Sequence, residues 1–472
     1  MAPVTMQSLL AIIERCVAHR VRLFTILFVV YGLAGCMAAA VLMPPFANID
    51  EGVHFVRADA ISLGGLVGVR QSASSAGGII HRKLRLVIGT IHPIVSDLNK
   101  RIDWDTENRT FAITWDVRSD QGSSSIGYVA FPTTAFYPPY SYLSDVVGIL
   151  LGRAFDLTIA ATLLLARAVG SITYVAIGAF AIAGAGEAAP LLFSVLLLPT
   201  AIAQGGSASQ DSFLFALAAL VASLTLAGLR DQTLVDRRRM LVLCVAIGML
   251  VTARPPYLPL AVLPLLLRGQ TIWLRLACSL AIVMVCILWS TLMAAFVAVP
   301  VVVEGGVSDV PHQAVQLLLH PVSFVSLVVQ TLGSTAYRKY VEFVGLGFWW
   351  LPHEYYVAAG CILVLATMLC MVSPHRGGWW PQSAAMLGVI GSAAALIFVA
   401  CYLFTRPDAP EIVGVQGRYF IPLALLIPGV LPAIPMRDKN LLALPLAVIA
   451  LFPIISIPTL LYAVVWRFYL AT

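Results

Sequence analysis

The chain has 472 residues, of which 60% are hydrophobic and only 11% are charged, and its mean hydropathy is +0.91. A soluble globular protein has about a quarter of its residues charged, because its surface must face water. The 29 lysines and arginines and 23 aspartates and glutamates give a net charge of only +6. This composition argues against a soluble enzyme, a disordered protein or a nucleic-acid binder. It predicts an all-α polytopic membrane protein whose first partner is the lipid bilayer.

Apolar segments long enough to form membrane helices recur along the chain. A helix needs about 20 residues to cross the hydrocarbon core, and we predict about eleven crossings on this basis. They cover residues 22–43, 158–183, 188–204, 211–229, 240–254, 256–268, 273–298, 353–373, 382–404, 419–435 and 441–463.

The distribution of arginines gives the predicted topology. Arg15, Arg20 and Arg22 precede the first apolar segment, and cytoplasmic segments are enriched in Lys and Arg. Leu33 to Cys36 resembles a lipoprotein cleavage box, but the apolar run continues to Met43, which favours an uncleaved helix. The predicted parts are a cytoplasmic N-terminus (1–21), a first transmembrane helix (22–43), an extracytoplasmic loop with interfacial helices (44–157), transmembrane helices (158–298), a second extracytoplasmic loop (299–352) and C-terminal transmembrane helices (353–472).

The first loop differs from the rest of the chain in composition. Residues 44–138 hold 18 of the 52 charged residues, so this segment must lie in water. The alternating run Phe111–Trp115 predicts a strand, and hence a small α/β subdomain. The apolar stretch Pro138–Leu151 is too short to span comfortably. Only if it stays at the interface do the later arginine-rich loops, including Arg237–Arg239, all become cytoplasmic and the C-terminus external.

The strongest candidate for chemistry lies just beyond the first predicted span. Asp50 and Glu51 are adjacent carboxylates, and a helix starting at Asn48 would place Asp50, His54 and Arg57 on one face. A carboxylate held by a cation there could accept a proton from a hydroxyl group. The alternative is structural, because Asn48 and Glu51 have the spacing of a capping box.

A tyrosine-rich motif ends the first loop. Tyr137 and Tyr140 flank Pro138 and Pro139, and tyrosines at a bilayer interface are commonly anchors. The alternative is that these side chains line a cavity beside Asp50.

Two charges interrupt apolar segments. Arg167 lies within the run 158–183, and a cation in a membrane span usually faces a cavity or a partner unless its side chain reaches the interface. Asp211 ends the polar run Gln204–Asp211. It could cap the next helix or position a substrate.

Two arginines stand at predicted external ends of spans, against the usual distribution of positive charge. Arg254 precedes Pro255-Pro256-Tyr257, and Arg418 precedes Tyr419. Arginine binds phosphate through several donors at once, so both segments predict a site for a lipid-linked phosphate or pyrophosphate. The alternative is that these arginines contact lipid headgroups.

Other signals are weaker. Charged residues in and after the second loop could close the site from above: Arg338, Lys339, Glu342, His353 and Glu354. The chain has no phosphate-binding loop of the GxxxxGK type, no HExxH and no GxSxG motif. We expect no cofactor, although Asp50 and Glu51 could offer oxygen ligands to a divalent cation.

The motifs together resemble the bacterial membrane family called domain of unknown function 2142. The resemblance covers roughly residues 22–435 and is carried by motifs in one order: the segment from Pro44 to Ala58, the YPPYSYL sequence at Tyr137, the segment from Leu198 to Asp211, the RPPYL sequence at Arg254 and the QGRYF sequence at Gln416. Ile49 and Gly52 stand where that family usually has proline, and Gln210 stands where it usually has tyrosine or a similar residue.

That family is similar to the GT-C glycosyltransferases, which take sugar from a polyprenyl phosphate or pyrophosphate. The resemblance implies that Asp50, with Glu51, is the catalytic acid–base position. It also implies a first loop with membrane-surface helices and a site that faces the periplasm or the outside of a bacterial inner membrane. No metal requirement follows from it.

The leading hypothesis is therefore a membrane glycosyltransferase that inverts the sugar's configuration. It would move a sugar from a polyprenyl-phosphate donor to an envelope glycan or another hydroxyl acceptor. The predicted catalytic residues are Asp50 and Glu51, and the predicted substrate-binding residues are His54, Arg57, Tyr137, Tyr140, Arg167, Asp211, Arg254, Tyr257, Arg418 and Tyr419. The alternatives are a transporter of lipid-linked glycans without chemistry, which needs accessible charges at the bilayer midplane, and an accessory subunit in which Asp50 only caps a helix.

Overall fold

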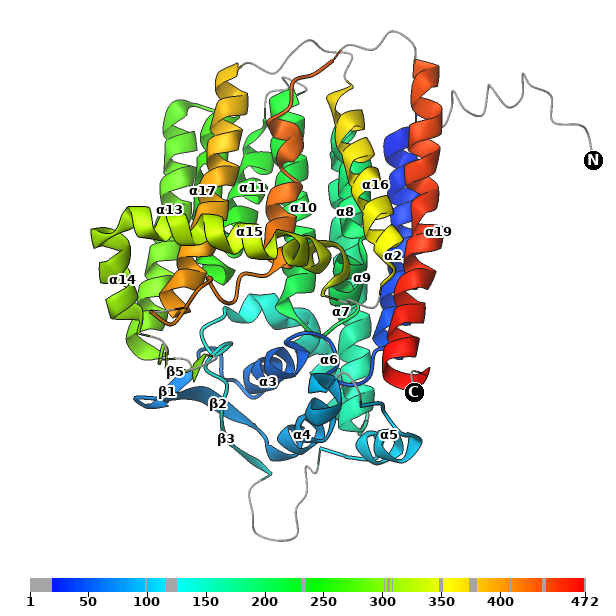
Figure 1. The fold of residues 1–472 in the computed structure, drawn as a ribbon, viewed down its shortest axis with the longest axis vertical. Coiled ribbons are helices and arrows are strands. Elements are labelled where there is room, and N and C mark those ends of the chain that lie inside the picture. The colour runs from blue at the N-terminus through cyan, green and yellow to red at the C-terminus, as the bar shows by residue number, and fades with distance from the viewer. Residues whose placement is uncertain are drawn as a thin grey trace, which may run out of the picture.

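The computed structural model describes residues 19–472 apart from 98–99, 116–124, 231–234, 301, 304–305, 308, 348–350, 373–379, 408, 435–438 and 471–472. Among the described residues, seven helices are long and apolar enough to cross a membrane. They are α2 (Arg20–Leu42), α7 (Ile159–Gly184), α10 (Gln210–Arg230), α13 (Ile272–Phe296), α16 (His353–Met371), α17 (Trp380–Phe404) and α19 (Ala443–Val465). The chain is an all-α polytopic membrane protein, as its composition predicts (Figure 1).

Two bent pairs of helices bring the number of candidate spans to at most nine in the described part of the chain. The first pair consists of η2 (Gly186–Ala188) with α8 (Ala189–Leu196) and then α9 (Pro199–Gly205), bent by 76°. The second pair, α14 (Val310–Leu319) and α15 (Pro321–Gly345), is bent by 106°. Pro199 and Pro321 each occupy the first position of the second helix, where proline fits best.

The prediction of eleven spans therefore exceeds what the helices show. The segment predicted at 240–254 is α11 (Arg237–Ala253), with 17 residues. The other two segments are broken at prolines, which remove backbone donors and disturb the helical hydrogen-bond pattern. They consist of η3 (Pro255–Val262) with α12 (Leu263–Leu266), and of η4 (Gly417–Phe420), α18 (Ile421–Ala424) and η5 (Ile427–Gly429).

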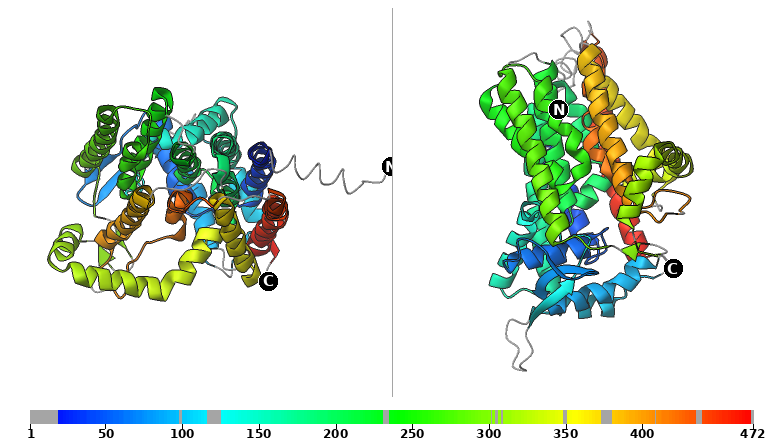
Figure 2. Two further views of the ribbon diagram at one scale, coloured as in Figure 1. Left: turned by 90° about the horizontal axis from the view of Figure 1, so that it is seen from above. Right: turned by 90° about the vertical axis from the view of Figure 1, so that its left-hand side faces the viewer.

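Helix α15 does not run with the other long helices. Figure 1 shows it lying across them, and in the view from above it lies in the plane of the picture while the others are seen end-on (Figure 2, left). Its outer side carries Val322, Val325 and Val329, which are 79%, 57% and 64% exposed. A helix with this orientation and an exposed apolar side suits the surface of a bilayer.

The first loop folds into a unit that we call the sheet-bearing subdomain (residues 44–157), at one end of the helical layer (Figure 1). Its three strands pair antiparallel in the order β1 (Val69–Ser72), β2 (Ser75–His81) and β3 (Ile126–Ala130). Its helices are α3 (Glu51–Ser62), α4 (Arg82–Ser96), α5 (Trp104–Phe111), η1 (Pro139–Tyr142) and α6 (Leu143–Ala154). A buried link joins α3 to β2, where Asp59 accepts a hydrogen bond of 2.8 Å from the backbone N–H of His81.

The strand predicted at Phe111–Trp115 is wrong. Phe111 ends α5, and the residues up to Trp115 form no strand. The polar residues before them decide the local structure: Asp103 caps α5 by accepting a hydrogen bond of 2.6 Å from the backbone N–H of Thr106.

Helix α6 is short, as predicted for Pro138–Leu151. Its 12 residues extend about 18 Å, short of the roughly 30 Å hydrocarbon core. Glycines let α6 lie close against α7, since a Cβ at Gly148 would come within 2.3 Å of the Cα of Ala166. The end of the first loop is thus held by tight packing between the short helix α6 and the long helix α7.

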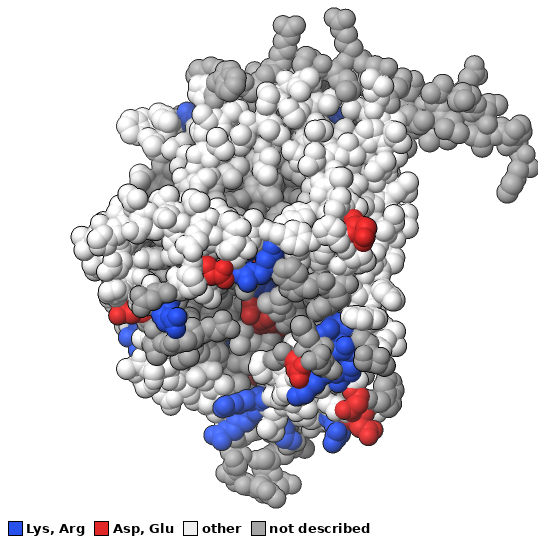
Figure 3. Space-filling view, in the orientation of Figure 1, with Lys and Arg blue, Asp and Glu red and all other residues white. Residues whose placement is uncertain are grey.

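Charged side chains gather toward the sheet-bearing subdomain. In the face drawn in Figure 3, blue and red atoms lie over this end and beside α15, and few lie over the long helices. The remaining described elements are η6 (Lys439–Leu442), η7 (Trp466–Leu470), and the short strands β4 (Val302–Val303) and β5 (Gly306–Val307). The boundary between the apolar layer and the charged end lies between α15 and α3 (Figure 1).

Candidate functional site

The loop between α2 and α3 is anchored on both sides of Asp50. On one side, the side-chain amide of Asn48 donates a hydrogen bond of 2.6 Å to the carbonyl of Ala203. On the other side, Glu51 is fully buried and pairs with Arg167 of α7, with contacts of 2.8 and 2.6 Å. These anchors fix the backbone around Asp50.

Arg167 uses every one of its guanidinium donors within the protein. Besides Glu51, it donates to the carbonyls of Ala40, Met43 and Pro44 at 2.7, 2.7 and 2.9 Å. The structure thus gives Arg167 a structural role, which differs from the prediction that it binds substrate. It neutralises Glu51 and satisfies carbonyls at the end of α2, where helices leave acceptors unpaired.

Glu51 also holds a second segment of the site. Its carboxylate accepts a hydrogen bond of 3.0 Å from the backbone N–H of Ala208, in the turn that precedes Asp211. A Cβ at Gly206 would lie 2.5 Å from the carbonyl oxygen of Cys36, so glycine lets this turn approach α2. With no surface exposed to solvent, Glu51 holds other segments in place in this geometry, and direct catalysis by it stays a prediction.

Asp50 differs from its neighbours in conformation and exposure. Its φ of 61° is in the left-handed region, which non-glycine residues adopt rarely and often at functional sites. It does not cap α3 with its side chain, so the capping alternative does not explain it. Its side chain is 45% exposed and forms an ion pair with Arg418.

Arg418 and Arg254 lie at breaks in the helical layer. Arg418 belongs to η4, and α15 presses so closely on this segment that a Cβ at Gly417 would lie 1.9 Å from the carbonyl oxygen of Lys339. Arg254 directly follows α11 and stacks over the ring of Tyr419, at 4.4 Å from its centre. The prolines that follow Arg254 prevent the helix from continuing.

Asp211 joins the two arginines. It is almost completely buried in the first turn of α10, and it pairs with Arg254 and with Arg418, whose Nε lies 3.2 Å from Oδ2. It is therefore a member of an ion-pair chain rather than a simple helix cap. We call Asp50, Arg418, Asp211 and Arg254, in this order of contact, the charge cluster.

The charge cluster has an unused donor. The Nη1 atom of Arg418 is buried and has no hydrogen-bond partner in the part of the chain that the structure describes. Buried polar atoms are nearly always satisfied, so an orphan donor needs an explanation. An anion such as a phosphate group, which matches the donor geometry of guanidinium groups, would provide one.

Aromatic side chains border the charge cluster on the subdomain side. The Nδ1 atom of His54 lies 2.8 Å from the hydroxyl of Tyr142, and the imidazole stacks on Tyr137 at 6.0 Å between ring centres. Burial lowers the pKa of His54 to about 4, although Asp50 and Asp211 oppose this shift. His54 is thus neutral near pH 7 and adds no positive charge to the cluster.

The pKa of His54 predicts a pH dependence of stability. An unfolded chain takes up the proton near pH 6.5, whereas the folded protein resists it down to about pH 4. Stability contributed by neutral His54 is therefore present above pH 6.5 and is lost as the pH falls toward 4, by roughly 3 kcal/mol in all. Thermal unfolding of His54→Gln in detergent should show a smaller fall between pH 7 and pH 4 than the wild type. Equal falls in the two proteins would contradict this prediction.

Three further predicted residues hold the surroundings together. Arg57 donates to the carbonyls of Gly65, Leu66 and Tyr137 at 2.9, 2.7 and 3.1 Å. Tyr140 donates to the carbonyl of Met249 at 2.5 Å, and Tyr257 donates to the carbonyl of Tyr419 at 2.8 Å. The structure uses these polar groups to join loops, and substrate binding by them stays a prediction.

The carboxylates do not form a metal site in this geometry. No group of three or more His, Cys, Asp or Glu residues that could hold a metal ion occurs among the described residues. Asp50 and Glu51, which could have shared a cation, turn to Arg418 and Arg167 respectively.

Two residues near the site were missed by the sequence-based prediction. Tyr142 contacts His54 and follows the predicted tyrosines in the same motif. Asp145 of α6 is buried. Burial, together with the nearby charge of Glu51, raises its pKa well above the usual range. The tyrosine motif gave a signal for Tyr142, and an acid inside an apolar segment is the signal that could have pointed to Asp145.

The geometry can be compared with known proteins. No curated protein and no solved structure shows a significant match to the chain. A family model described as "Predicted membrane protein (DUF2142)" matches residues 33–427, a range that contains every member of the charge cluster. Because the match covers most of the chain, the protein belongs to this family of predicted membrane proteins, which its sequence motifs resemble.

Proposed function

We propose that the protein is a membrane glycosyltransferase that moves a sugar from a polyprenyl-phosphate donor to a hydroxyl acceptor. The observation that carries the proposal is the charge cluster: an accessible carboxylate, Asp50, lies against a buried arginine with a free donor, Arg418. A base and a phosphate-binding cation are the groups that this transfer requires.

The reaction follows from these two groups. Asp50 accepts the proton of the acceptor hydroxyl, and the hydroxyl oxygen attacks the anomeric carbon. The bond from this carbon to the phosphate oxygen breaks, and the polyprenyl phosphate leaves with the electron pair. Attack from the face opposite the leaving group inverts the configuration. The leaving phosphate needs no separate acid, unlike the leaving group of a typical glycosidase.

The charges balance in this scheme. With two arginines and two aspartates ionised, the charge cluster is neutral. Proton transfer to Asp50 makes it positive at the moment when the phosphate changes from a singly charged diester to a monoester of charge about −2. The arginines stabilise that additional charge in a site largely shielded from water, where such stabilisation is strongest.

The proposed location is a bacterial inner membrane, with the charge cluster facing the periplasm or the outside. The sheet-bearing subdomain lies at one end of the helical layer (Figure 1), and we place this end outside. Arg237–Arg239 begin α11, and Arg22 lies in the first turn of α2. Clusters of arginine favour the cytoplasmic side. An envelope glycan is the acceptor that we propose for an enzyme with this orientation.

The transporter alternative has less support from the geometry. A transporter requires charges that the substrate can reach from both sides of the membrane. Arg167, which was the candidate for such a charge, has its donors occupied by Glu51 and by carbonyls.

A donor-binding experiment tests the role of Arg418. A labelled polyprenyl-phosphate sugar should bind purified Arg418→Gln about 10- to 100-fold more weakly than the wild type, since a charge-assisted hydrogen bond contributes about 1.5–3 kcal/mol. Arg406→Gln, at an exposed position in the preceding loop, is the matched control and should bind normally. Equal affinities of all three proteins would contradict the proposed phosphate site.

Catalysis is tested with the same panel of labelled donors and acceptors, with and without a chelator. Release of sugar from the lipid by the wild type would establish an enzyme. Labelled lipid that crosses liposome membranes unchanged would instead favour the transporter.

A further inference from the structure

His54 and Tyr142 form a buried hydrogen-bonded pair next to Asp50. The backbone N–H of His54 donates to the carbonyl of Asp50 at 3.1 Å, so His54 follows Asp50 by one turn of α3. Its Nδ1 atom lies 2.8 Å from the hydroxyl of Tyr142, the last residue of η1. His54 is 4% exposed and Tyr142 is completely buried. The hydroxyl of Tyr142 therefore cannot use bulk water as a partner.

Burial decides which of the two groups donates this hydrogen bond. If Nδ1–H donated, the phenolic proton of Tyr142 would need another acceptor, and His54 is its only hydrogen-bond partner among the described residues. A buried donor left unpaired is unfavourable. The hydroxyl of Tyr142 therefore donates to an unprotonated Nδ1. Because burial keeps His54 neutral, with a pKa of about 4, its one ring proton is on Nε2.

The Nε2 atom of His54 faces the site. It has no hydrogen-bond partner in the part of the chain that the structure describes, and it does not belong to the enclosed polar atoms that lack a partner. It therefore reaches a space that water or a ligand can enter. The charges of all four members of the charge cluster act on the imidazole, and Tyr137 stacks on it at 6.0 Å between ring centres. An N–H donor is thus available beside the charge cluster.

We infer that Tyr142 is a positioning residue that fixes the proton of His54 on Nε2, so that His54 donates a hydrogen bond to a phosphate oxygen of the bound donor. The identity of this ligand rests on the proposed function, whereas the position of the proton follows from the buried pair alone. Nη1 of Arg418 also lacks a partner, and both groups neighbour Asp50. Two such N–H groups suit the oxygens of one anion.

The position of the proton also separates the roles of His54 and Asp50. With Nε2 protonated and Nδ1 occupied by Tyr142, the imidazole has no free lone pair for the proton of an acceptor hydroxyl. A carboxylate has only lone pairs to offer. Of these two groups, Asp50 is therefore the base and His54 is the hydrogen-bond donor.

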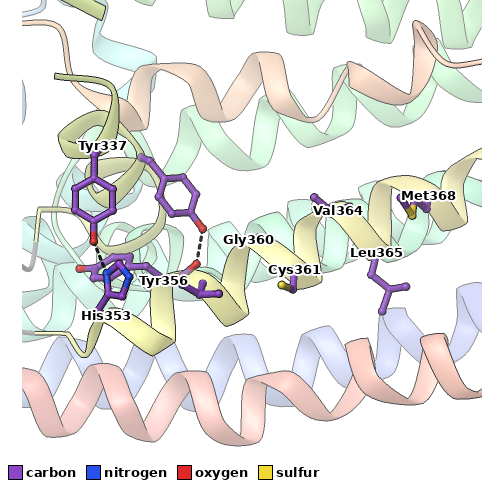
Figure 4. A pocket seen from close by; sticks show the side chains of 10 residues that line it. Tyr337, His353, Tyr356, Gly360, Cys361, Val364, Leu365 and Met368 are labelled. Carbon is purple, nitrogen blue, oxygen red and sulfur yellow. Dashed lines mark hydrogen bonds between the residues drawn. The ribbon is translucent and has the colours of Figure 1, made fainter. Parts of the chain in front are cut away.

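A second pair of tyrosine and histidine provides a matched control. In the groove between α15 and α16, the hydroxyl of Tyr337 lies 2.8 Å from Nδ1 of His353 (Figure 4). Tyr337 is 52% exposed and His353 is exposed as well. Water can accept the proton of this hydroxyl, so the pair imposes neither position of the proton on His353. The two pairs share their geometry and differ in burial.

¹⁵N NMR of the detergent-solubilised full chain, labelled at histidine, tests the position of the proton near neutral pH. The His54 resonances, identified by their loss in His54→Gln, should show a protonated Nε2 and an unprotonated, hydrogen-bonded Nδ1. Tyr142→Phe should shift the Nδ1 resonance to that of a nitrogen without a hydrogen bond, whereas Tyr337→Phe should leave both resonances in place. A protonated Nδ1 in the wild type would overturn the inference. The wild-type spectrum decides this even if Tyr142→Phe does not fold.

Binding of a labelled polyprenyl phosphate without sugar tests the contact that we assign to Nε2–H. His54→Phe keeps a ring that can stack on Tyr137 but loses the N–H group, and it should bind about tenfold more weakly than the wild type. His54→Gln, whose amide can donate a hydrogen bond, should recover part of the affinity, and Tyr337→Phe should bind normally. Equal affinities of His54→Phe and the wild type would refute the contact with phosphate. A loss confined to the sugar-bearing donor would refute it as well.

The inference and the proposed function fail in different ways. If Nε2 carries the proton but no donor in the panel loses its sugar, the role of Tyr142 stands and the transferase is refuted. If sugar is transferred but Nδ1 carries the proton, the transferase stands and the role of Tyr142 is refuted.

Discussion

Asparagine at position 50 is expected to abolish sugar transfer and to leave the protein folded. The amide cannot accept the acceptor's proton, and the loss of a positioned general base typically lowers the rate about 10²- to 10⁴-fold. Stability should change by less than about 1 kcal/mol, because the carboxylate is 45% exposed and exposed ion pairs contribute little. Asparagine also tolerates the left-handed backbone at this position. Transfer rate and thermal unfolding, measured on the same preparation, check both statements.

Asp156→Asn is a close control for this substitution. Asp156 is also an exposed aspartate with a left-handed backbone, with φ of 52°, but it lies between α6 and α7 and contacts no member of the charge cluster. Its variant should transfer sugar at the wild-type rate. Full activity of Asp50→Asn would refute the role of Asp50 as the base.

Donor binding separates the base from the phosphate site. In Asp50→Asn, Arg418 loses an anionic partner, so the donor phosphate should bind as tightly as in the wild type or more tightly. Arg418→Gln should show the opposite change. If both variants lost donor affinity to the same extent, Asp50 would be a residue that positions Arg418 rather than a base.

The members of the charge cluster could be found from the sequence, because each breaks an apolar pattern. Arg254 and Arg418 stand beside prolines or glycines at the ends of apolar segments, and Asp211 ends a polar run. Charges in such places are expensive in a membrane protein unless a partner or a function compensates for them. Composition and spacing therefore selected the right segments, although they could not pair the residues.

The pairing could not be predicted, because adjacent residues have opposite environments. Asp50 and Glu51 look equivalent in the sequence, yet one is 45% exposed and the other is fully buried. The difference arises from the left-handed conformation at Asp50 and from Arg167, which lies 116 residues after Glu51. Long-range partners of this kind leave no local pattern.

The predicted number of spans exceeds the number of candidate spans among the described residues for another reason. Hydropathy measures the cost of exposing side chains, but a spanning helix also needs unbroken backbone hydrogen bonds. Prolines at 255, 256 and 259 replace a predicted span by η3, and Pro422 and Pro428 lie in the broken segment after Arg418. These breaks are the places where Arg254 and Arg418 meet Asp211, so the error in the fold coincides with the site.

Arg167→Met is expected to destabilise the protein by about 3–5 kcal/mol, the usual effect of leaving one partner of a buried ion pair uncompensated. Glu51 has no exposed surface, and the carbonyls of Ala40, Met43 and Pro44 would lose their donors as well. The apparent melting temperature in detergent should therefore fall markedly. Arg22→Met makes the same change at an exposed position of α2 and should have little effect.

A double variant distinguishes the two contributions of Arg167. Glu51→Gln combined with Arg167→Met removes both charges, so the double variant should be more stable than the sum of the single effects predicts, by about 0.5–3 kcal/mol. The double variant should retain slow sugar transfer. Glu51 also holds the turn before Asp211 through the N–H of Ala208, and the amide oxygen of glutamine at position 51 can accept that hydrogen bond. A stable Arg167→Met protein that had lost only donor affinity would instead assign Arg167 to the phosphate, as its place in an apolar segment first indicated.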